Sequence, residues 1–179
     1  MKTAENELHR TLPPSPWVVR HSRLIASGGP VLDLACGSGR HARLLAGMGF
    51  AVLAVDCNSE ALAALADVAG VTASRLDLES GDWPLAGRSF AGIVVANYLW
   101  RPRLPDVLAM LAPGGVLIYE TFMLGNEAYG RPSTPEFLLR PGELRELAQA
   151  AGLREIAFEE GYAASPKPAM RQAICAVRA

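Results

Sequence analysis

The sequence predicts an α/β domain built on a doubly wound, mostly parallel sheet of about seven strands, with an antiparallel pair at its C-terminal end. Apolar runs alternate with helical patterns along most of the 179 residues, and this alternation is typical of repeated βαβ units. The last two apolar runs have no helical pattern between them, so we expect them to pair antiparallel. The length suits one domain, which we assign to residues 16–179.

The N-terminal part is expected to be irregular up to residue 15 because it is polar and closes on Leu12-Pro13-Pro14-Ser15-Pro16. A short amphipathic helix is predicted from Trp17 to Ala26. The turn residues Gly28-Gly29-Pro30 end this helix and introduce the first strand.

The central part reads as alternating buried strands and amphipathic helices. The apolar and β-branched runs predict strands at Val31–Ala35, Ala51–Val55, Val71–Leu76, Phe90–Ala96 and Val116–Thr121. The helical patterns between them lie at Ser38–Gly47, at Ser59–Val68 with Ser59 as a possible cap, and at Leu104–Leu111. The turn Pro113-Gly114-Gly115 precedes the fifth strand.

The C-terminal part begins with an irregular segment, Met123–Arg140, which contains several glycines and prolines. A helix is predicted over Glu143–Ala151, started by Pro141-Gly142 and stopped by Gly152. Two final strands, Leu153–Glu159 and Arg171–Val177, are joined by a proline-rich connection.

Composition excludes several classes of protein. Half of the residues are apolar, 20% are charged, and the formal net charge is −1, so a broad basic face for nucleic acid is not expected. No apolar run is long enough to span a membrane, and the polar N-terminal region lacks the apolar core of a secretory signal. The cysteines and histidines show neither a disulfide framework nor metal-ligand spacing, so we expect a cytoplasmic protein without a metal. They are Cys36, Cys57 and Cys175, and His9, His21 and His41.

The first strand leads into a glycine-containing loop, Asp33-Leu34-Ala35-Cys36-Gly37-Ser38-Gly39-Arg40. Gly37 and Gly39 allow a sharp turn and let a ligand approach the main chain. The spacing Gly37-x-Gly39-x-x-Ala42 also fits a dinucleotide fingerprint. Asp33 favours a different ligand, because a carboxylate so close to the loop suits an ammonium group better than a pyrophosphate.

Residues Val31–Arg40 resemble the first motif of class I S-adenosylmethionine-dependent methyltransferases, [DE]-x-G-x-G-x-G. Ala35 stands where the first glycine is common, and its small side chain is expected to leave binding intact. The resemblance implies a Rossmann-like methyltransferase fold and S-adenosyl-L-methionine as cofactor. It assigns Asp33, Ala35, Gly37 and Gly39 to the cofactor site.

Residues at the ends of the second and third strands extend the resemblance. Asp56, with Cys57 beside it, follows the second strand, where an acid can accept both ribose hydroxyls. The family places an acid after the third strand on the adenine amino group and an apolar neighbour on the ring. These roles fall on Asp77 and Leu78.

Residues after the fourth and fifth strands become candidates for the acceptor side. By resemblance, Asn97 and Tyr98 lie beneath the methionine part of the cofactor and beside the acceptor. Glu120 ends the fifth strand and is a candidate base or a holder of a cationic acceptor. The long segment that follows suits a lid, with Tyr129 and Arg131 able to close over the acceptor.

A narrower likeness concerns the acceptor itself. Cys36–His41 followed by Gly49–Asp56 is similar to the tellurite-resistance and thiopurine-methyltransferase-like branch, whose acceptors are small soft nucleophiles. A small-molecule acceptor is favoured because the chain is short and has no basic excess. Two other functions stay open: an NAD-type oxidoreductase on a related fold, and a cofactor-binding regulator without turnover. Ordinary structural roles also remain for single residues, such as a solvated loop acid at Asp77 and a packing histidine at His41.

Overall fold

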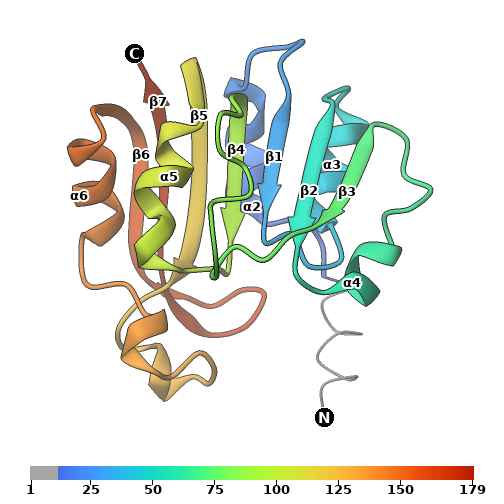
Figure 1. The fold of residues 1–179 in the computed structure, drawn as a ribbon. Helices are drawn as coiled ribbons and strands as arrows, with labels where there is room; N and C mark the ends of the chain where they lie inside the picture. Colours follow the sequence, from blue (N-terminus) through green and yellow to red (C-terminus); the bar gives the residue numbers. More distant parts are fainter. Residues whose placement is uncertain (1–11) are drawn as a thin grey trace.

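A computed structural model describes residues 12–179, and its strands form one seven-stranded sheet (Figure 1). The strand order is β3-β2-β1-β4-β5-β7-β6. All neighbouring pairs are parallel except β5–β7 and β7–β6, so β7 alone runs against the others. The predicted fold class is therefore confirmed, including the antiparallel C-terminal pair. The strands are β1 (Val31–Leu34), β2 (Val52–Asp56), β3 (Val71–Arg75), β4 (Phe90–Ala96), β5 (Leu111–Phe122), β6 (Leu153–Ala163) and β7 (Ala169–Arg178).

Helices cover both faces of the sheet, as the alternating pattern requires. On one face α5 and α6 pack over the larger apolar core; on the other, α2, α3 and α4 cover a second core (Figure 1). The helices are α2 (Pro16–His21), α3 (Arg40–Gly47), α4 (Ser59–Ala63), α5 (Leu104–Ala109) and α6 (Glu143–Ala150). Short 3₁₀ turns are η1 (Ser22–Leu24), η2 (Arg101–Arg103), η3 (Asn126–Ala128) and η4 (Pro135–Phe137).

The strand order reverses between β1 and β4, which places the topological switch point at the carboxyl ends of these two strands. The same edge of the sheet, at the bottom of Figure 1, carries α4, the segment after β5 and the β6–β7 connection. Ligands of open α/β sheets bind at this edge, so the fold directs attention to the residues that follow β1, β2, β4 and β5.

Several element boundaries differ from the sequence prediction. The predicted helix Ser38–Gly47 begins only at Arg40, because Gly39 has a left-handed φ of 76°. The next helix is capped by Asn58 rather than Ser59 and ends at Ala63, where i−3 turns replace the α-helical bonds. The fifth strand starts at Leu111, five residues earlier than expected, with a register shift against β4.

The segment 123–140 is tied to the body of the domain rather than projecting from it. The side chain of Asn126, 2% exposed, donates to the Pro132 carbonyl and accepts from the Met170 N–H. Arg101 donates to the carbonyls of Glu136 and Leu138 and to both carboxylate oxygens of Glu143. The sequence analysis gave Arg101 no role, so this network is a finding of the structure.

The expected irregular segment 1–15 lies mostly outside the described residues; residues 12–15 have no regular structure. Within residues 12–179, no helix has the length and apolar character needed to cross a membrane.

Candidate cofactor and acceptor site

Asp33 is the most unusual polar group at the carboxyl edge of the sheet. It lies in the middle of a fully buried strand and is itself 1% exposed. Its Oδ2 has no hydrogen-bond partner within residues 12–179. Burial raises the pKa of Asp33 to about 7 and the charge of Asp56 adds to this, while the Ala42 N–H and Arg40 oppose it. A buried carboxylate oxygen without a partner is costly, and a cationic ligand group would satisfy it.

The loop after β1 adopts a backbone shape that opens toward a ligand. Ala35, Gly37 and Gly39 all have left-handed φ values, of 54°, 55° and 76°. A Cβ on Gly37 would meet no atom within 4 Å, so space lies open above it. A Cβ on Gly39 would instead collide with the Leu65 side chain, so that glycine allows Leu65 to pack against the start of α3. The two glycines therefore have different roles, one facing ligand space and one facing the core.

Ala35 takes the position where the family motif has its first glycine. A left-handed conformation costs an alanine roughly 1–2 kcal/mol more than a glycine. The strain sits beside the predicted cofactor site, where such backbone conformations commonly gather. The fold accommodates alanine at position 35, because Ala35 adopts the same left-handed region as Gly37 and Gly39.

Asp56 links the loops that follow β1 and β2. Its Oδ2 accepts the Gly37 N–H at 2.8 Å, and its Oδ1 accepts the Asn58 N–H at 2.9 Å. A carboxylate offers about four acceptor positions, so both oxygens retain capacity for hydroxyl donors. Cys57 is exposed next to it, and burial and the charge of Asp56 raise the pKa of its thiol. Asp56 is thus held where a ribose could meet it.

Asp77 is engaged in its own loop. Its Oδ1 accepts the N–H groups of Glu79 and Ser80, and its Oδ2 accepts the Ser80 hydroxyl at 2.5 Å. These bonds, that of the hydroxyl first, lower the pKa of Asp77. Leu78 is 5% exposed and packs into the larger core. The adenine roles predicted for both residues stay predictions, and the local bonds account for an acid at Asp77.

Tyr98 follows β4 and is close enough to Glu79, in the loop after β3, for the charge of Glu79 to affect its hydroxyl. Its hydroxyl is buried with no hydrogen-bond partner among residues 12–179. Burial raises its pKa, followed by the charge of Glu79. Tyr98 therefore neighbours the predicted nucleoside contacts, although the sequence analysis grouped it with the acceptor.

Asn97 and Glu120 meet at the ends of β4 and β5. Asn97 has a left-handed φ of 59°, and its N–H donates to the Glu120 carbonyl at 3.0 Å. Glu120 is buried, and its Oε2 lies 3.8 Å from Nη2 of Arg171 on β7. The same Nη2 donates to Oδ1 of Asn97 at 2.5 Å. The structure thus brings together two predicted acceptor-side residues and adds one that the sequence analysis missed.

Other residues considered from the sequence have structural roles. His41 is 3% exposed, its Nε2 accepts the Ser15 N–H at 3.1 Å, and burial lowers its pKa to about 3. Tyr129 stacks against Tyr162 of β6, with ring centroids 5.5 Å apart, and both rings are largely exposed. No group of three potential metal ligands occurs within residues 12–179.

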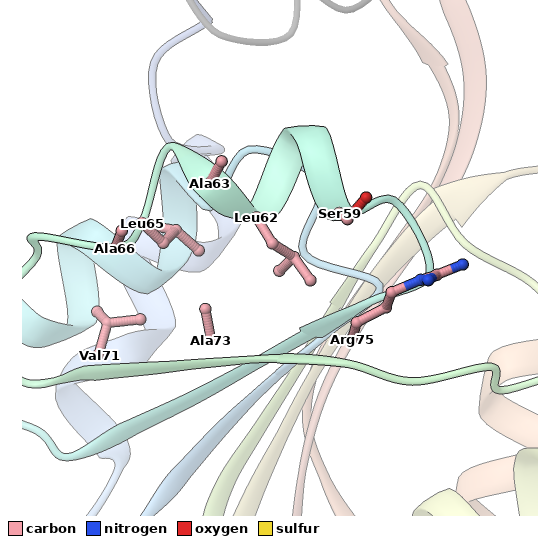
Figure 2. A pocket seen from close by; sticks show the side chains of 8 residues that line it. All are labelled: Ser59, Leu62, Ala63, Leu65, Ala66, Val71, Ala73 and Arg75. Atoms are coloured by element: carbon pink, nitrogen blue, oxygen red, sulfur yellow. The ribbon is translucent and has the colours of Figure 1, made fainter.

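A separate hollow lies between α4 and the edge of the sheet (Figure 2). Apolar side chains of α4, β3 and the turn after α4 line most of it, and Ser59 and Arg75 stand at one end. It contains no carboxylate and lies under α4 rather than at the switch point. The hollow therefore does not coincide with the cofactor site that the sequence predicts at the loops after β1 and β2.

The fold thus places β1 beside the topological switch point of the sheet, with a buried Asp33 oxygen in it that has no partner within residues 12–179. In comparison with known families, residues 31–115 match the family described as "Methyltransferase domain". Over these residues, a little under half of the chain, the sequence is thus similar to a methyltransferase domain. No curated protein matches the sequence.

Solved structures of methyltransferases share the fold. TehB from Haemophilus influenzae superposes with a TM-score of 0.75 at 20% identity; the alignment covers 90% of this chain but only 61% of that one. A TehB-like methyltransferase from Corynebacterium glutamicum gives 0.70 at 19% identity, covering 99% and 95% of the two chains. The N-methyltransferase NodS from Bradyrhizobium japonicum gives 0.66 at 20% identity, covering 93% and 99%. At these identities the likeness establishes the fold.

Proposed function

We propose that this protein transfers the methyl group of S-adenosylmethionine to a small-molecule acceptor at the carboxyl edge of the sheet. The observation that carries the proposal is the buried Oδ2 of Asp33, which has no partner within residues 12–179 and belongs to the strand that leads into the loop with the open Gly37. This pair fits the amino acid end of the cofactor, which has an ammonium group that a carboxylate can accept from. The pyrophosphate of a dinucleotide would gain nothing from Asp33.

In this proposal Asp33 holds the ammonium group and Asp56 accepts from the ribose hydroxyls. The bound cofactor supplies an activated methyl group on a sulfonium, so the protein mainly has to align the acceptor and exclude water. Glu120 is suited to take a proton from an acceptor that must lose one, because its carboxylate is buried beside Asn97. The amide of Asn97 is oriented by Arg171, which leaves its NH₂ group to donate toward the acceptor.

The small size of the acceptor and a cytoplasmic location belong to the same proposal. The segment 123–140 is tied down at the acceptor edge by Asn126 and Arg101, which supports a confined site. The TehB-like and NodS neighbours show that the fold is used by methyltransferases, and we extend methyl transfer to this chain as part of the proposal. The three cysteines are unpaired, as is usual in a reducing compartment.

Calorimetric titration tests the proposal against its rivals. We expect S-adenosylhomocysteine to bind the full chain and NADH not to bind. Preference for NADH would favour an oxidoreductase, and the absence of binding by either would remove the proposal. Formation of S-adenosylhomocysteine from S-adenosylmethionine, followed over a panel of thiols, amines and carboxylic acids, then separates an enzyme from a cofactor-binding regulator.

A further inference from the structure

Arg171 occupies an unusual place on the acceptor side of the site. It lies at the start of β7, opposite Phe122 in the register with β5. Its guanidinium carbon sits 4.6 Å from the centroid of the Phe122 ring, and its Nη2 reaches across to Asn97 at the end of β4. The side chain is only 17% exposed. The guanidinium of Arg171 therefore extends from β7 to the end of β4, next to the switch point.

The guanidinium is incompletely used by the protein. Within residues 12–179 its one hydrogen bond goes to Asn97, while the Glu120 carboxylate stays at 3.8 Å, beyond hydrogen-bond distance. Arginine has five N–H donors in a planar fork that matches a carboxylate or another oxyanion. The side chain remains 17% exposed, so the N–H groups that the protein does not use can be reached by a ligand.

The charges around Arg171 favour a negative ligand. Arg40 is the first residue of α3, and the charges of Glu120 and Asp33 oppose the effect of burial on its pKa. The charge of Arg40 in turn helps to lower the pKa of Arg171. Two arginines that remain charged thus face Glu120 and the Asp33 carboxyl, whose pKa is raised to about 7. A bound cofactor adds a sulfonium and an ammonium against one carboxylate. Asp56 balances this added charge over the site as a whole, so the attraction for a negative group on the acceptor is local to the Arg171 guanidinium.

Position decides which ligand Arg171 meets. Asp33 and Gly37 belong to the β1 side, where the proposed function puts the amino acid end of the cofactor. Arg171, Asn97 and Glu120 come from β7, β4 and β5, on the other side of the switch point. We propose that Arg171 recognises a carboxylate on the acceptor, so that the protein methylates organic acids at an atom near their carboxyl group. This inference rests on the proposed function and deepens it.

The experiment uses the full chain saturated with S-adenosylhomocysteine and two matched pairs of probes, acetate with acetamide and benzoate with benzamide. Binding is measured by calorimetry at constant ionic strength for wild type, Arg171→Met and Arg171→Lys. Arg145→Met is the matched control, because Arg145 also lies over an aromatic ring, that of Phe158, and pairs with a glutamate, Glu155, but it does so between α6 and β6. Thermal melting of each variant verifies that it is folded.

We expect at least one acid to bind the wild-type complex about tenfold or more tightly than its amide, the scale of a charge-assisted pair. The preference should be lost in Arg171→Met, reduced in Arg171→Lys and unchanged in Arg145→Met. No preference in wild type, or a preference that survives Arg171→Met, overturns the inference. If S-adenosylhomocysteine itself does not bind wild type, the proposed function fails instead.

A second measurement separates the acceptor from the cofactor's own carboxylate. Affinities for S-adenosylhomocysteine and for 5′-methylthioadenosine, which lacks the amino acid end, are compared in wild type and Arg171→Met. We expect both affinities to change less than about twofold. A loss for S-adenosylhomocysteine alone would assign Arg171 to the cofactor carboxylate and would overturn the inference.

Discussion

We expect the buried carboxyl of Asp33 to make cofactor binding dependent on pH. Its pKa of about 7 lies roughly three units above the ordinary value of 3.8, which corresponds to about 4 kcal/mol at 1.36 kcal/mol per unit. Only the ionised form can accept from an ammonium group without first losing a proton. Affinity for S-adenosylhomocysteine should therefore be constant above pH 7 and fall toward tenfold per unit below it, so that pH 5.5 costs about thirtyfold.

The assay is calorimetric titration from pH 5.5 to 8.5 on wild type and Asp33→Asn. Arg40 and Asp56 face Asp33, and Arg40 keeps its charge across this range, whereas His41, with a pKa of about 3, stays neutral. Asp33→Asn should bind weakly and without the slope. Asp106→Asn, which changes an acid on α5, is the matched control and should retain the wild-type profile.

The same shift predicts a change in the stability of the unliganded protein. Because the folded-state pKa is raised, the contribution of Asp33 is most favourable below pH 4 and falls by about 4 kcal/mol as pH rises through 7. Asp33→Asn should thus gain stability relative to wild type between pH 5 and 8 in urea denaturation. A flat binding profile in wild type, or an equal slope in Asp33→Asn, would refute the reasoning.

Four further outcomes are expected. Gly37→Ala should weaken S-adenosylhomocysteine binding more than tenfold. Gly39→Ala should mainly destabilise the fold, by about 2–3 kcal/mol in urea denaturation, because the new Cβ at position 39 enters the core. Equal effects of the two substitutions on binding would contradict this difference in role. Ala35→Gly should raise the free energy of unfolding by about 0.5–1 kcal/mol by relieving a φ of 54°, and a loss of stability would show that the loop is unstrained. Asp56→Asn should weaken S-adenosylhomocysteine binding by about 1–3 kcal/mol in calorimetry; unchanged affinity would remove it from the site. Burial pushes the pKa of Glu143 upward, but its hydrogen bonds with arginine outweigh this and lower it, so Glu143→Gln should cost about 2–3 kcal/mol at pH 7. The difference from wild type should shrink as pH falls below about 4.5, and a constant difference in urea denaturation would argue against it.

The fold was predictable because the pattern of apolar residues is regular and the turn residues agree with it. The predicted strand Phe90–Ala96 agrees with β4, and the helix predicted over Glu143–Ala151 is one residue longer than α6. The predicted helix Ser59–Val68 was too long, because an apolar period cannot distinguish an α-helix from the successive i−3 turns that follow Ala63. The five residues of α4 bury a single apolar side chain, that of Leu62, so the pattern of apolar residues does not determine where this helix ends.

Part of the cofactor side was predictable for a local reason. Asp33, Gly37 and Gly39 lie within seven residues, so the turn that joins a strand to a helix brings them together whatever the rest of the chain does. The left-handed φ of Ala35 could not be read in the same way, because nothing in an alanine indicates it. Tyr98 shows the limit of the approach, since its direction depends on how the loop after β4 packs beside Glu79.

The acceptor side depends on contacts between distant parts of the chain. Arg171 reaches Asn97, 74 residues away, only because β7 pairs with β5 in one antiparallel register that sets Arg171 opposite Phe122. A shift of one residue in that register would turn the guanidinium to the other face of the sheet. The first strand and its loop need no such register. A sequence can therefore keep the loop after β1 while the register and length of β5, β6 and β7 change which charged side chains lie beside Asn97 and Glu120.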